Sequence, residues 1–234
     1  MIVLTGEILI DLIGHNMNSR SALAYTGILG GSALNIASIL ARVGAPIRFV
    51  SEVGQDFLGD WAIARIAERK IETRFIQQLP GVTTPLSVAE VDAEGNARFS
   101  YYRALATTQF SPDSAAMARA KWLYFGSLSA FDPRNSPGIE SMLEIALEYD
   151  VLVSFDPNLH AEPGKAYWEQ LHRYMPYDSV LKCSLDDARF LFPNASDDPK
   201  ILLEHLVELG APVTVLTLGA AGAMAALRTR MMRV

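Results

Sequence analysis

The stretch that decides the fold is GILGGSALNIASILARVGAP, residues 27–46, where two glycines precede an apolar-periodic run. Apolar residues recur there at helical spacing, which predicts a helix from Ser32 to Val43. Ser32 is the N-cap candidate, and Gly44 indicates where the helix stops. Two interpretations stay open locally. The glycines form an ordinary tight turn, or they let a ligand approach the bare backbone beside the amide of Asn35.

Outward from this stretch, short apolar runs alternate with longer helical patterns. The predicted strands are residues 1–5, 46–53, 121–126, 151–156, 179–184 and 213–219. The predicted helices are residues 32–43, 57–70, 113–120, 137–149, 165–174, 185–192 and 199–209. This alternation is typical of a mostly parallel sheet with helices on both faces. We therefore expect an α/β fold of three layers.

Two segments, about residues 12–29 and 86–104, interrupt the alternation because neither contains a helix pattern. The second indicates a hairpin about the turn at residues 93–96. We expect both segments to form a small accessory sheet, and the alternative is an ordinary surface hairpin. Tyr101 and Arg103 at the end of the second segment favour a lid that closes over a polar ligand.

Composition and charge exclude several classes of protein. The 234 residues are 50% hydrophobic and 20% charged, which indicates a single globular domain. The net charge of −6 argues against a broad basic face for nucleic acid, and no apolar run reaches the length of a membrane span. Cys183, the single cysteine, excludes an internal disulfide. The N-terminus has no basic leader pattern, so we expect a cytoplasmic protein.

Polar and glycine residues cluster just after the predicted strands. They are Asp11, Gly30, Gly31, Gly54, Asp56, Gly126, Asp156, Asn158, Ser184, Asp187, Gly219 and Gly222. Ligands bind at the carboxyl edge of open parallel sheets, so this placement predicts a site there. The sequence contains no Walker A, dinucleotide, zinc-protease or nucleophile-elbow motif. The four histidines are scattered, which favours structural roles over metal binding.

A family resemblance rests on several motifs. The run GGSALNIASILARVGAPIRFVSEVGQDFLG, residues 30–59, resembles the N-terminal signature of the ribokinase-like carbohydrate kinases, the phosphofructokinase-B group. GEILIDL resembles the family's first strand with its sugar-binding aspartate, and FSYYR its lid strand. FDPNLH resembles its D-x-N-x-R element, VLKCSLDDARFL its N-x-x-E region and VTVLTLGAAGA its T-x-G-x-x-G nucleotide turn. The resemblance covers essentially the whole chain.

The resemblance implies ATP-dependent phosphorylation of a sugar hydroxyl, in the fructokinase or 2-keto-3-deoxygluconate kinase branch. The sugar-binding residues that it implies are Asp11, Gly30, Gly31, Asn35, Tyr101, Arg103, Asn158 and His160. The nucleotide-binding residues that it implies are Lys182, Ser184, Asp187, Thr217, Gly219 and Gly222. Asp187 would act on Mg²⁺ through a bound water. A projecting lid with an apolar face needs cover, so we also expect a homodimer through the lid.

Three departures accompany the resemblance. His160 stands where the family often has arginine, and Ser184 and Asp187 replace the Asn and Glu of N-x-x-E. The family's Gly-Ala-Gly-Asp element, which supplies the catalytic aspartate, does not occur in residues 1–234. The catalytic residue is therefore unknown, and we expect a natural protein of about 300 residues. For these residues alone, negligible turnover is the expectation, because a general base and its anion-stabilising donors are absent.

Three alternatives to an active sugar kinase remain. One is a non-catalytic sugar-binding relative or a truncated, inactive kinase. Another is a nucleoside kinase of the same fold. The last is an α/β nucleotide- or cofactor-binding enzyme outside this family.

Overall fold

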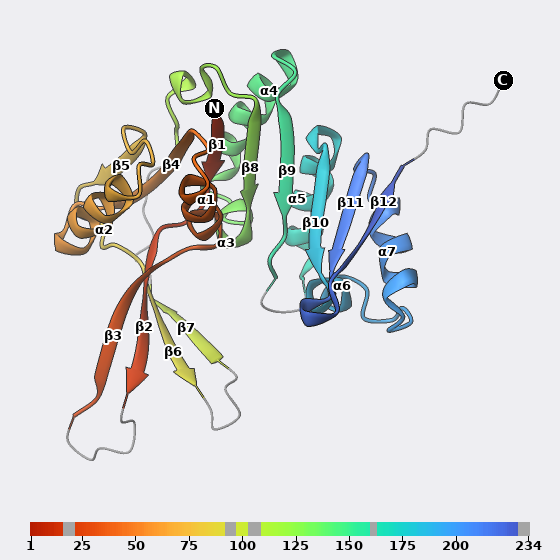
Figure 1. Cartoon of the computed structure of the whole chain (residues 1–234), viewed down its shortest axis with the longest axis horizontal. Helices are drawn as coiled ribbons and strands as arrows, with labels where there is room; N and C mark the ends of the chain where they lie inside the picture. The colour runs from red at the N-terminus through yellow and green to blue at the C-terminus, as the bar shows by residue number, and fades with distance from the viewer. Residues whose placement is uncertain (16–21, 92–96, 103–108, 160–162, 229–234) are drawn as a thin grey trace.

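A computed structural model describes residues 1–15, 22–91, 97–102, 109–159 and 163–228 (Figure 1). The strands of its main sheet are β1 (Ile2–Thr5), β4 (Ile47–Gly54), β5 (Ile76–Leu79), β8 (Trp122–Gly126), β9 (Leu152–Asp156), β10 (Val180–Ser184), β11 (Val213–Thr217) and β12 (Ala223–Leu227). Their order is β12-β11-β10-β9-β8-β1-β4-β5, and only the β11–β12 pair is antiparallel. The mostly parallel sheet expected from the sequence is confirmed.

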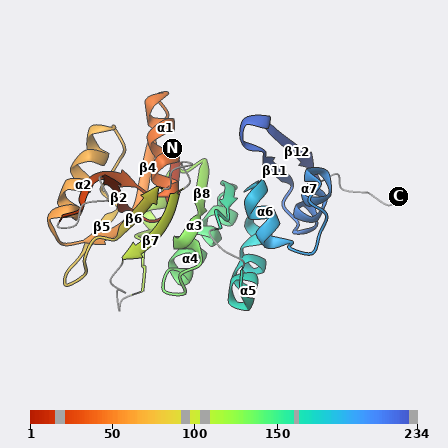
Figure 2. The same cartoon turned by 90° about the horizontal axis from the view of Figure 1, so that it is seen from below.

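Helices cover this sheet in two layers. They are α1 (Ser32–Arg42), α2 (Phe57–Glu68), α3 (Ser127–Ala130), α4 (Ser136–Glu148), α5 (Lys165–Tyr174), α6 (Leu185–Leu191) and α7 (Pro199–Glu208), with 3-10 turns η1 (Ser114–Met117), η2 (Met175–Tyr177) and η3 (Gly219–Ala221). Figure 2 shows α1 and α2 on one side of the sheet and α4 and α5 on the other. Each side has its own apolar core, because alternate strand residues such as Phe49 and Val50 face opposite layers.

A second sheet of four strands forms the lid. Its strands are β2 (Leu9–His15), β3 (Ala24–Gly30), β6 (Leu86–Val91) and β7 (Ala97–Tyr102), in the order β3-β2-β6-β7. The lid projects from the carboxyl edge of the main sheet (Figure 1). The hairpin of β6 and β7 is confirmed, and its turn at residues 93–96 lies outside the described residues.

Asp11 lies in the lid and not just past the first strand of the main sheet, as the sequence placed it. The chain leaves the main sheet after Thr5, and β2 begins at Leu9. Asp11 pairs there with Ile28 of β3 and Ser87 of β6. Residues 9–12 of GEILIDL therefore belong to the second strand, because residues 9–15 pair with strands of the lid.

The start of α1 corrects a second expectation. Gly31, not Ser32, is the N-cap, and Ser32 is the first helical residue. Gly31 has a φ of 119°, a conformation that L side chains rarely adopt, and a Cβ there would collide with the Glu7 carbonyl oxygen. The Ser32 N–H donates to the Glu7 carboxylate at 3.4 Å, so a side chain from another segment satisfies one of the free N–H groups at the start of the helix.

The helix predicted over residues 113–120 is only the 3-10 turn η1. Arg48, buried in β4, explains the difference. Its guanidinium donates to the carbonyl oxygens of Ala115, Ala116 and Ala118 at 3.3, 2.7 and 3.1 Å. These carbonyls point to the arginine, which leaves them poorly placed to accept the i+4 N–H groups of an α-helix.

Helices cover one face of strands β9 to β12 more completely than the other. The cores of α4 to α7 pack on one face of these strands. On the other face, Leu152 is 47% exposed and Leu227 is 73% exposed. The two further strands that the sequence did not predict, β5 and β12, lie at the sheet edges, where side chains are only partly buried and the apolar pattern is weak.

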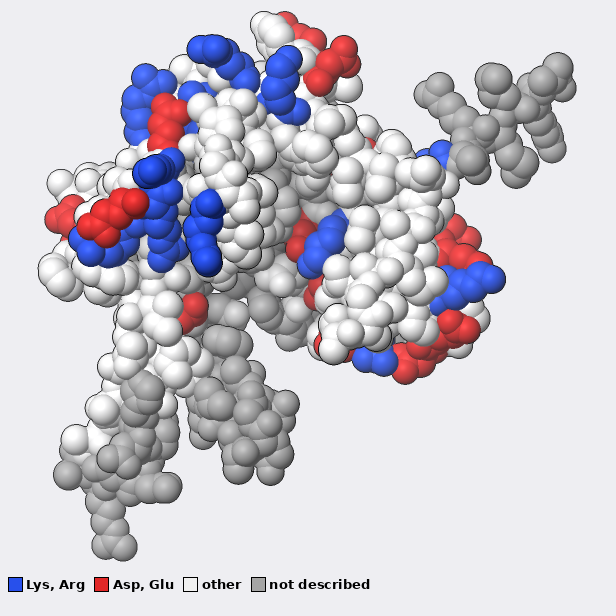
Figure 3. Space-filling view, in the orientation of Figure 1, with Lys and Arg blue, Asp and Glu red and all other residues white. Residues whose placement is uncertain are grey.

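Charged side chains are also unevenly distributed over the surface. On the face in Figure 3, Lys and Arg side chains gather over the part that α1 and α2 form, and Asp and Glu side chains lie beside them. Across the described residues, no helix has both the length and the apolar character that a bilayer crossing requires.

Candidate active site

Five of the predicted sugar-binding residues lie where the lid joins the main sheet. We call Asp11, Gly30, Gly31, Asn35 and Tyr101 the predicted sugar site. The Asp11 carboxylate accepts a hydrogen bond from the Ser87 hydroxyl, which orients it on the face of the lid. A Cβ at Gly30 would collide with this carboxylate, so the glycine is needed for the close approach of β3 to β2. The structure therefore brings these residues together.

Tyr101 lies on the lid strand β7, beside two carboxylates. Burial raises the pKa of its phenol, and the negative charges of Asp11 and Glu7 raise it further. Tyr101 is nevertheless 39% exposed, so its face is open to a ligand. A neutral phenol can donate its hydrogen bond to a hydroxyl oxygen or to a carboxylate. The predicted sugar site therefore combines ionised acceptors with an aromatic donor.

Glu7 connects two segments beside this site through its carboxylate. One carboxylate oxygen accepts from the Ser32 N–H at 3.4 Å, and the other accepts from the Ser129 N–H at 3.1 Å. These donors belong to the first turn of α1 and to α3, which are far apart in the sequence. Glu7 thus holds both segments against the connection between β1 and β2.

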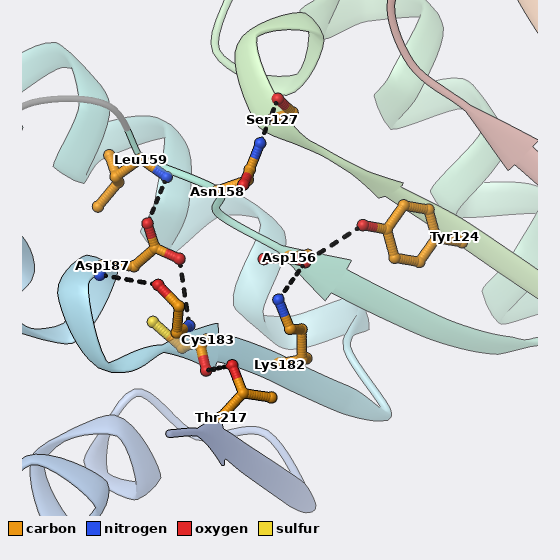
Figure 4. Close-up of polar contacts among 10 residues, drawn as sticks. Tyr124, Ser127, Asp156, Asn158, Leu159, Lys182, Cys183, Asp187 and Thr217 are labelled. Atoms are coloured by element: carbon orange, nitrogen blue, oxygen red, sulfur yellow. Dashed lines mark hydrogen bonds and ion pairs between the residues drawn. The ribbon is translucent and has the colours of Figure 1, made fainter. Parts of the chain in front are cut away.

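A polar cluster joins β8, β9 and β10 around Asp156 (Figure 4). Asp156 ends β9 and is 3% exposed. Its Oδ2 accepts from Lys182 Nζ at 2.8 Å and from the Tyr124 hydroxyl at 3.4 Å. Burial raises the pKa of Asp156, and the Lys182 charge opposes that rise. Asn158, two residues on, donates to the Ser127 hydroxyl at 3.0 Å, which ties the loop after β9 to α3.

Ser184 and Asp187 form a capping box at the start of α6. The Asp187 N–H donates to the Ser184 hydroxyl at 3.0 Å, and the Asp187 carboxylate accepts from the Ser184 N–H at 3.1 Å. Its other oxygen accepts from the Leu159 N–H at 2.8 Å. Asp187 is 4% exposed, and both of its carboxylate oxygens accept backbone N–H groups. The described residues contain no group of three or more metal-binding side chains.

Two glycines shape the turn after β11. Gly219 has a φ of 58° and Gly222 a φ of 96°, and an added Cβ on either would meet no atom within 4 Å. The backbone conformation, not crowding, thus favours glycine here, and the turn presents open backbone. The Thr217 hydroxyl donates to the Cys183 carbonyl oxygen at 3.4 Å, which holds the end of β11 to β10. This turn lies on the same sheet edge as Asp187.

A cavity of about 210 Å³ lies beneath the lid. Its walls include Glu7 from the connection between β1 and β2, the lid residues Leu9, Leu86 and Tyr101, and Phe110 and Asn135 beside α4. Tyr101 is the only predicted site residue among the described residues that line it. Leu9 also borders Asp11, since both would contact a Cβ on Gly30. The cavity therefore adjoins the predicted sugar site.

Comparison with known proteins decides the family. The model for the pfkB family carbohydrate kinases matches residues 1–233, nearly the whole chain. The chain belongs to the pfkB family of carbohydrate kinases. The resemblance stated from the sequence motifs is thus confirmed, and with it the assignment as an ATP-dependent sugar kinase.

Relatives of this pfkB kinase include enzymes for different sugars. It is 28% identical over 228 residues to an ATP-dependent 6-phosphofructokinase from Thermoanaerobacterium thermosaccharolyticum, covering 95% of this chain and 70% of the relative. It is 27% identical over 232 residues to probable fructokinase-4 from Arabidopsis thaliana, covering 95% and 71%. The solved fructokinase from Halothermothrix orenii is 27% identical with a TM-score of 0.81, covering 97% and 82%.

Some predicted site residues of this pfkB kinase lie outside the described residues, and sequence reasoning missed other residues that the structure places at the candidate site. Arg103 and His160 belong to the first group. Glu7, Ser87 and Tyr124 belong to the second. Tyr124 stands in an apolar run that indicated only core, and Ser87 carries no local signal. Glu7 follows directly on Gly6 after a strand, which was the one available hint.

Proposed function

We propose that this sugar kinase phosphorylates a neutral ketohexose of the fructose type. The observation that carries the proposal is the charge of the part of the predicted sugar site that the structure describes, which leaves out Arg103 and His160. Two carboxylates, Asp11 and Glu7, lie beside Tyr101, and the cationic Arg134 on the neighbouring cavity wall is paired with Glu52 at 2.6 Å. Carboxylates accept hydrogen bonds from sugar hydroxyls but repel an anionic substrate.

This charge argument separates the candidate substrates. Fructose is uncharged, whereas fructose 6-phosphate and 2-keto-3-deoxygluconate are anions. Resemblance to fructokinases supports the same choice, since several relatives carry that name. The cavity of about 210 Å³ is smaller than the 300–1,000 Å³ that holds drug-sized ligands, which suits a single monosaccharide.

The phosphoryl donor in the proposal is ATP with Mg²⁺. The open turn of Gly219 and Gly222 would offer backbone N–H groups to phosphate oxygens. Asp187 would hold Mg²⁺ through a water, since both its oxygens already accept backbone N–H groups and retain further lone pairs. Mg²⁺ would neutralise phosphate charge, and Lys182 would add a cation next to it.

We also propose that the kinase is a homodimer through its lid. Large apolar side chains on β3 and β7 are exposed, including Ile28 at 51% and Tyr102 at 60%. A second copy of the same sheet would bury this surface. Light scattering at micromolar concentration tests the proposal, with a dimeric mass as the expected result and a strictly monomeric mass as the contradicting one.

The proposed substrate is tested by measuring binding and turnover together. Isothermal titration calorimetry compares fructose, fructose 6-phosphate, 2-keto-3-deoxygluconate and adenosine on the same preparation. ADP formation is then followed with each sugar, using the protein as its gene encodes it. We expect fructose to bind most tightly and to give the highest kcat/KM. A preference for either anion would overturn the charge argument, and a preference for adenosine would favour the nucleoside-kinase alternative.

A further inference from the structure

Asp56 connects the turn after β4 to the segment from which the lid strand β6 begins. It is the N-cap of α2, where its Oδ1 accepts a hydrogen bond from the Gly59 N–H at 2.8 Å. The same carboxylate binds Thr84, which is 28 residues further along the chain. Its Oδ2 accepts from the Thr84 N–H and its Oδ1 from the Thr84 hydroxyl, each at 2.7 Å. One side chain therefore joins two segments that are far apart in the sequence.

Thr84 is enclosed by the same turn and is 3% exposed. Its hydroxyl oxygen accepts from the Gly54 N–H at 3.1 Å. A Cβ on Gly54 would collide with the Thr84 backbone nitrogen, and a Cβ on Gly59 would lie 3.0 Å from the Thr84 hydroxyl oxygen. The two glycines thus leave room for Thr84, and its position relative to the main sheet is closely defined.

The Asp56 carboxylate is ionised near neutral pH. Burial would raise its pKa, but hydrogen bonds from Thr84 and Gly59 outweigh that effect and lower the pKa below 3.8. Hydrogen bonds to a charged acceptor are stronger than those between neutral groups. The contact between Asp56 and Thr84 is therefore a firm one.

The chain passes from Thr84 directly into β6 (Figure 1). Pro85 restricts its own φ and favours an extended conformation at Thr84, so this connection is stiff. The Pro85 carbonyl oxygen accepts from the Ile10 N–H at 3.0 Å, where β6 meets β2. Next in β6, Ser87 is fully buried and donates to the Asp11 carboxylate. The position of Thr84 therefore sets where Ser87 meets Asp11.

The segment around Thr84 also forms part of the cavity beneath the lid. Val82, Thr83, Pro85 and Leu86 line this cavity. A shift of the segment relative to the main sheet would move this wall and Ser87 together. Both the shape of the cavity and the orientation of Asp11 thus depend on how the segment is held.

We propose that Asp56 is a positioning residue for sugar binding, which holds Thr84 so that β6 presents Ser87 to Asp11. The inference rests on the proposed function, because that function places the sugar at Asp11 beneath the lid. Asp56 needs no contact with the sugar for this role. Without it, β6 can shift, and the Asp11 carboxylate is no longer held in place for a sugar hydroxyl.

Helix capping alone is the competing explanation, because Asp56 also begins α2. Asp56→Ser separates the two roles. Serine is a favourable N-cap residue, but its single, nearer oxygen cannot bind Gly59 and Thr84 together as the carboxylate does. Asp198→Ser is the matched control, since Asp198 is exposed and caps α7 by accepting from the Lys200 N–H at 2.8 Å.

Thr84 offers a second pair of variants. Thr84→Val keeps the shape of the side chain and removes the hydroxyl, while the bond from Gly59 to Asp56 that caps α2 remains. Thr84→Ser keeps the hydroxyl. We expect Thr84→Val to weaken fructose binding as Asp56→Ser does, and Thr84→Ser to retain it.

The experiment measures the Kd of fructose and the Kd of AMP-PNP with Mg²⁺ separately by calorimetry, on the protein as its gene encodes it. In Asp56→Ser we expect the fructose Kd to rise at least about 10-fold, because small misplacements of a binding group are costly. Its AMP-PNP Kd stays within about 2-fold of wild type, as do both constants in Asp198→Ser. Amide hydrogen exchange in β6 becomes faster in Asp56→Ser and stays unchanged in Asp198→Ser.

Several outcomes would overturn the inference. Wild-type fructose affinity in Asp56→Ser leaves Asp56 with a capping role only. An equal loss of affinity for fructose and AMP-PNP, or the same loss in Asp198→Ser, indicates general destabilisation instead of positioning. If Asp56→Ser does not fold, Thr84→Val takes its place and is judged by the same criteria.

Failure of the proposed function gives a different result. A wild type that binds another sugar in preference to fructose refutes the proposed substrate, and the same comparison with that sugar then decides the inference. A wild type that binds AMP-PNP but no sugar refutes both.

Discussion

The carboxylate of Asp187 accepts a hydrogen bond from the Leu159 N–H at 2.8 Å, across the carboxyl ends of β10 and β9. Its second oxygen accepts from the Ser184 N–H at 3.1 Å. One buried side chain therefore caps α6 and anchors the loop that carries Asn158. A predicted nucleotide-binding residue therefore supports a loop that carries a predicted sugar-binding residue.

Asp187→Asn tests this double role. The amide keeps the shape of the side chain, but its NH₂ group meets a backbone N–H that needs an acceptor. We expect a loss of about 1–3 kcal/mol in the free energy of unfolding and weaker binding of AMP-PNP. Urea denaturation and calorimetry measure the two effects. Asp186→Asn is the control, because Asp186 is exposed and pairs with Arg189 on its own helix. Equal stability of the two variants would contradict the assigned role.

Asp11→Ala removes an ionised acceptor from the predicted sugar site. A hydrogen bond to a charged group contributes roughly 1.5–3 kcal/mol, so we expect the Kd of fructose to rise roughly 10- to 150-fold. Calorimetry with fructose measures this change. Asp150→Ala, in an exposed turn, is expected to leave the affinity unchanged. Unaltered affinity in Asp11→Ala would exclude Asp11 from the site.

Gly30→Ala tests the close approach of β3 to β2. The added Cβ would collide with the Asp11 carboxylate and displace it from the Ser87 hydroxyl. We expect weaker fructose binding together with a lower Tm. Gly164→Ala serves as the control, since its Cβ would meet no atom within 4 Å and its φ is −80°. Thermal denaturation and calorimetry distinguish the two variants, and wild-type affinity in Gly30→Ala would refute the crowding argument.

Asp178→Asn is expected to stabilise the protein in a pH-dependent way. Both carboxylate oxygens of Asp178 are buried without partners among the described residues, and burial raises its pKa well above 3.8. The folded state thus retains a proton that the unfolded state releases, so wild-type stability is full below pH 3.8 and falls as pH rises from there. Asn cannot ionise and avoids this loss.

The measurement for Asp178→Asn is the difference in unfolding free energy from wild type at pH 4 and at pH 7. We expect the variant's advantage to grow with pH, at up to about 1.4 kcal/mol per pH unit until the folded carboxyl ionises. Asp150→Asn controls for surface charge and should show no such growth. A difference that is flat with pH would show that Asp178 ionises normally in the folded state.

Local sequence signals determined much of the fold. The glycine pair before α1 and the alternation of apolar runs with helical patterns each act over a few residues. The predicted central strands match β1, β4 and β8 to β11 closely because buried parallel strands are continuous apolar runs. Motifs spread over the whole chain indicated the family. Edge strands such as β5 carry weaker patterns and were missed.

Only the tertiary structure decided what distant residues do to one another. The sequence predicted an ordinary helix at residues 113–120, but the Arg48 guanidinium donates to carbonyl oxygens of that segment. The sequence placed Ser32 as a cap, but Gly31 is the N-cap and the Ser32 N–H donates to the carboxylate of Glu7. It could not show that Tyr124 reaches from a core strand to Asp156. The physical reason is the same in each case: a motif specifies backbone conformation nearby, whereas a hydrogen bond across the sheet exists only once the strands are placed beside one another.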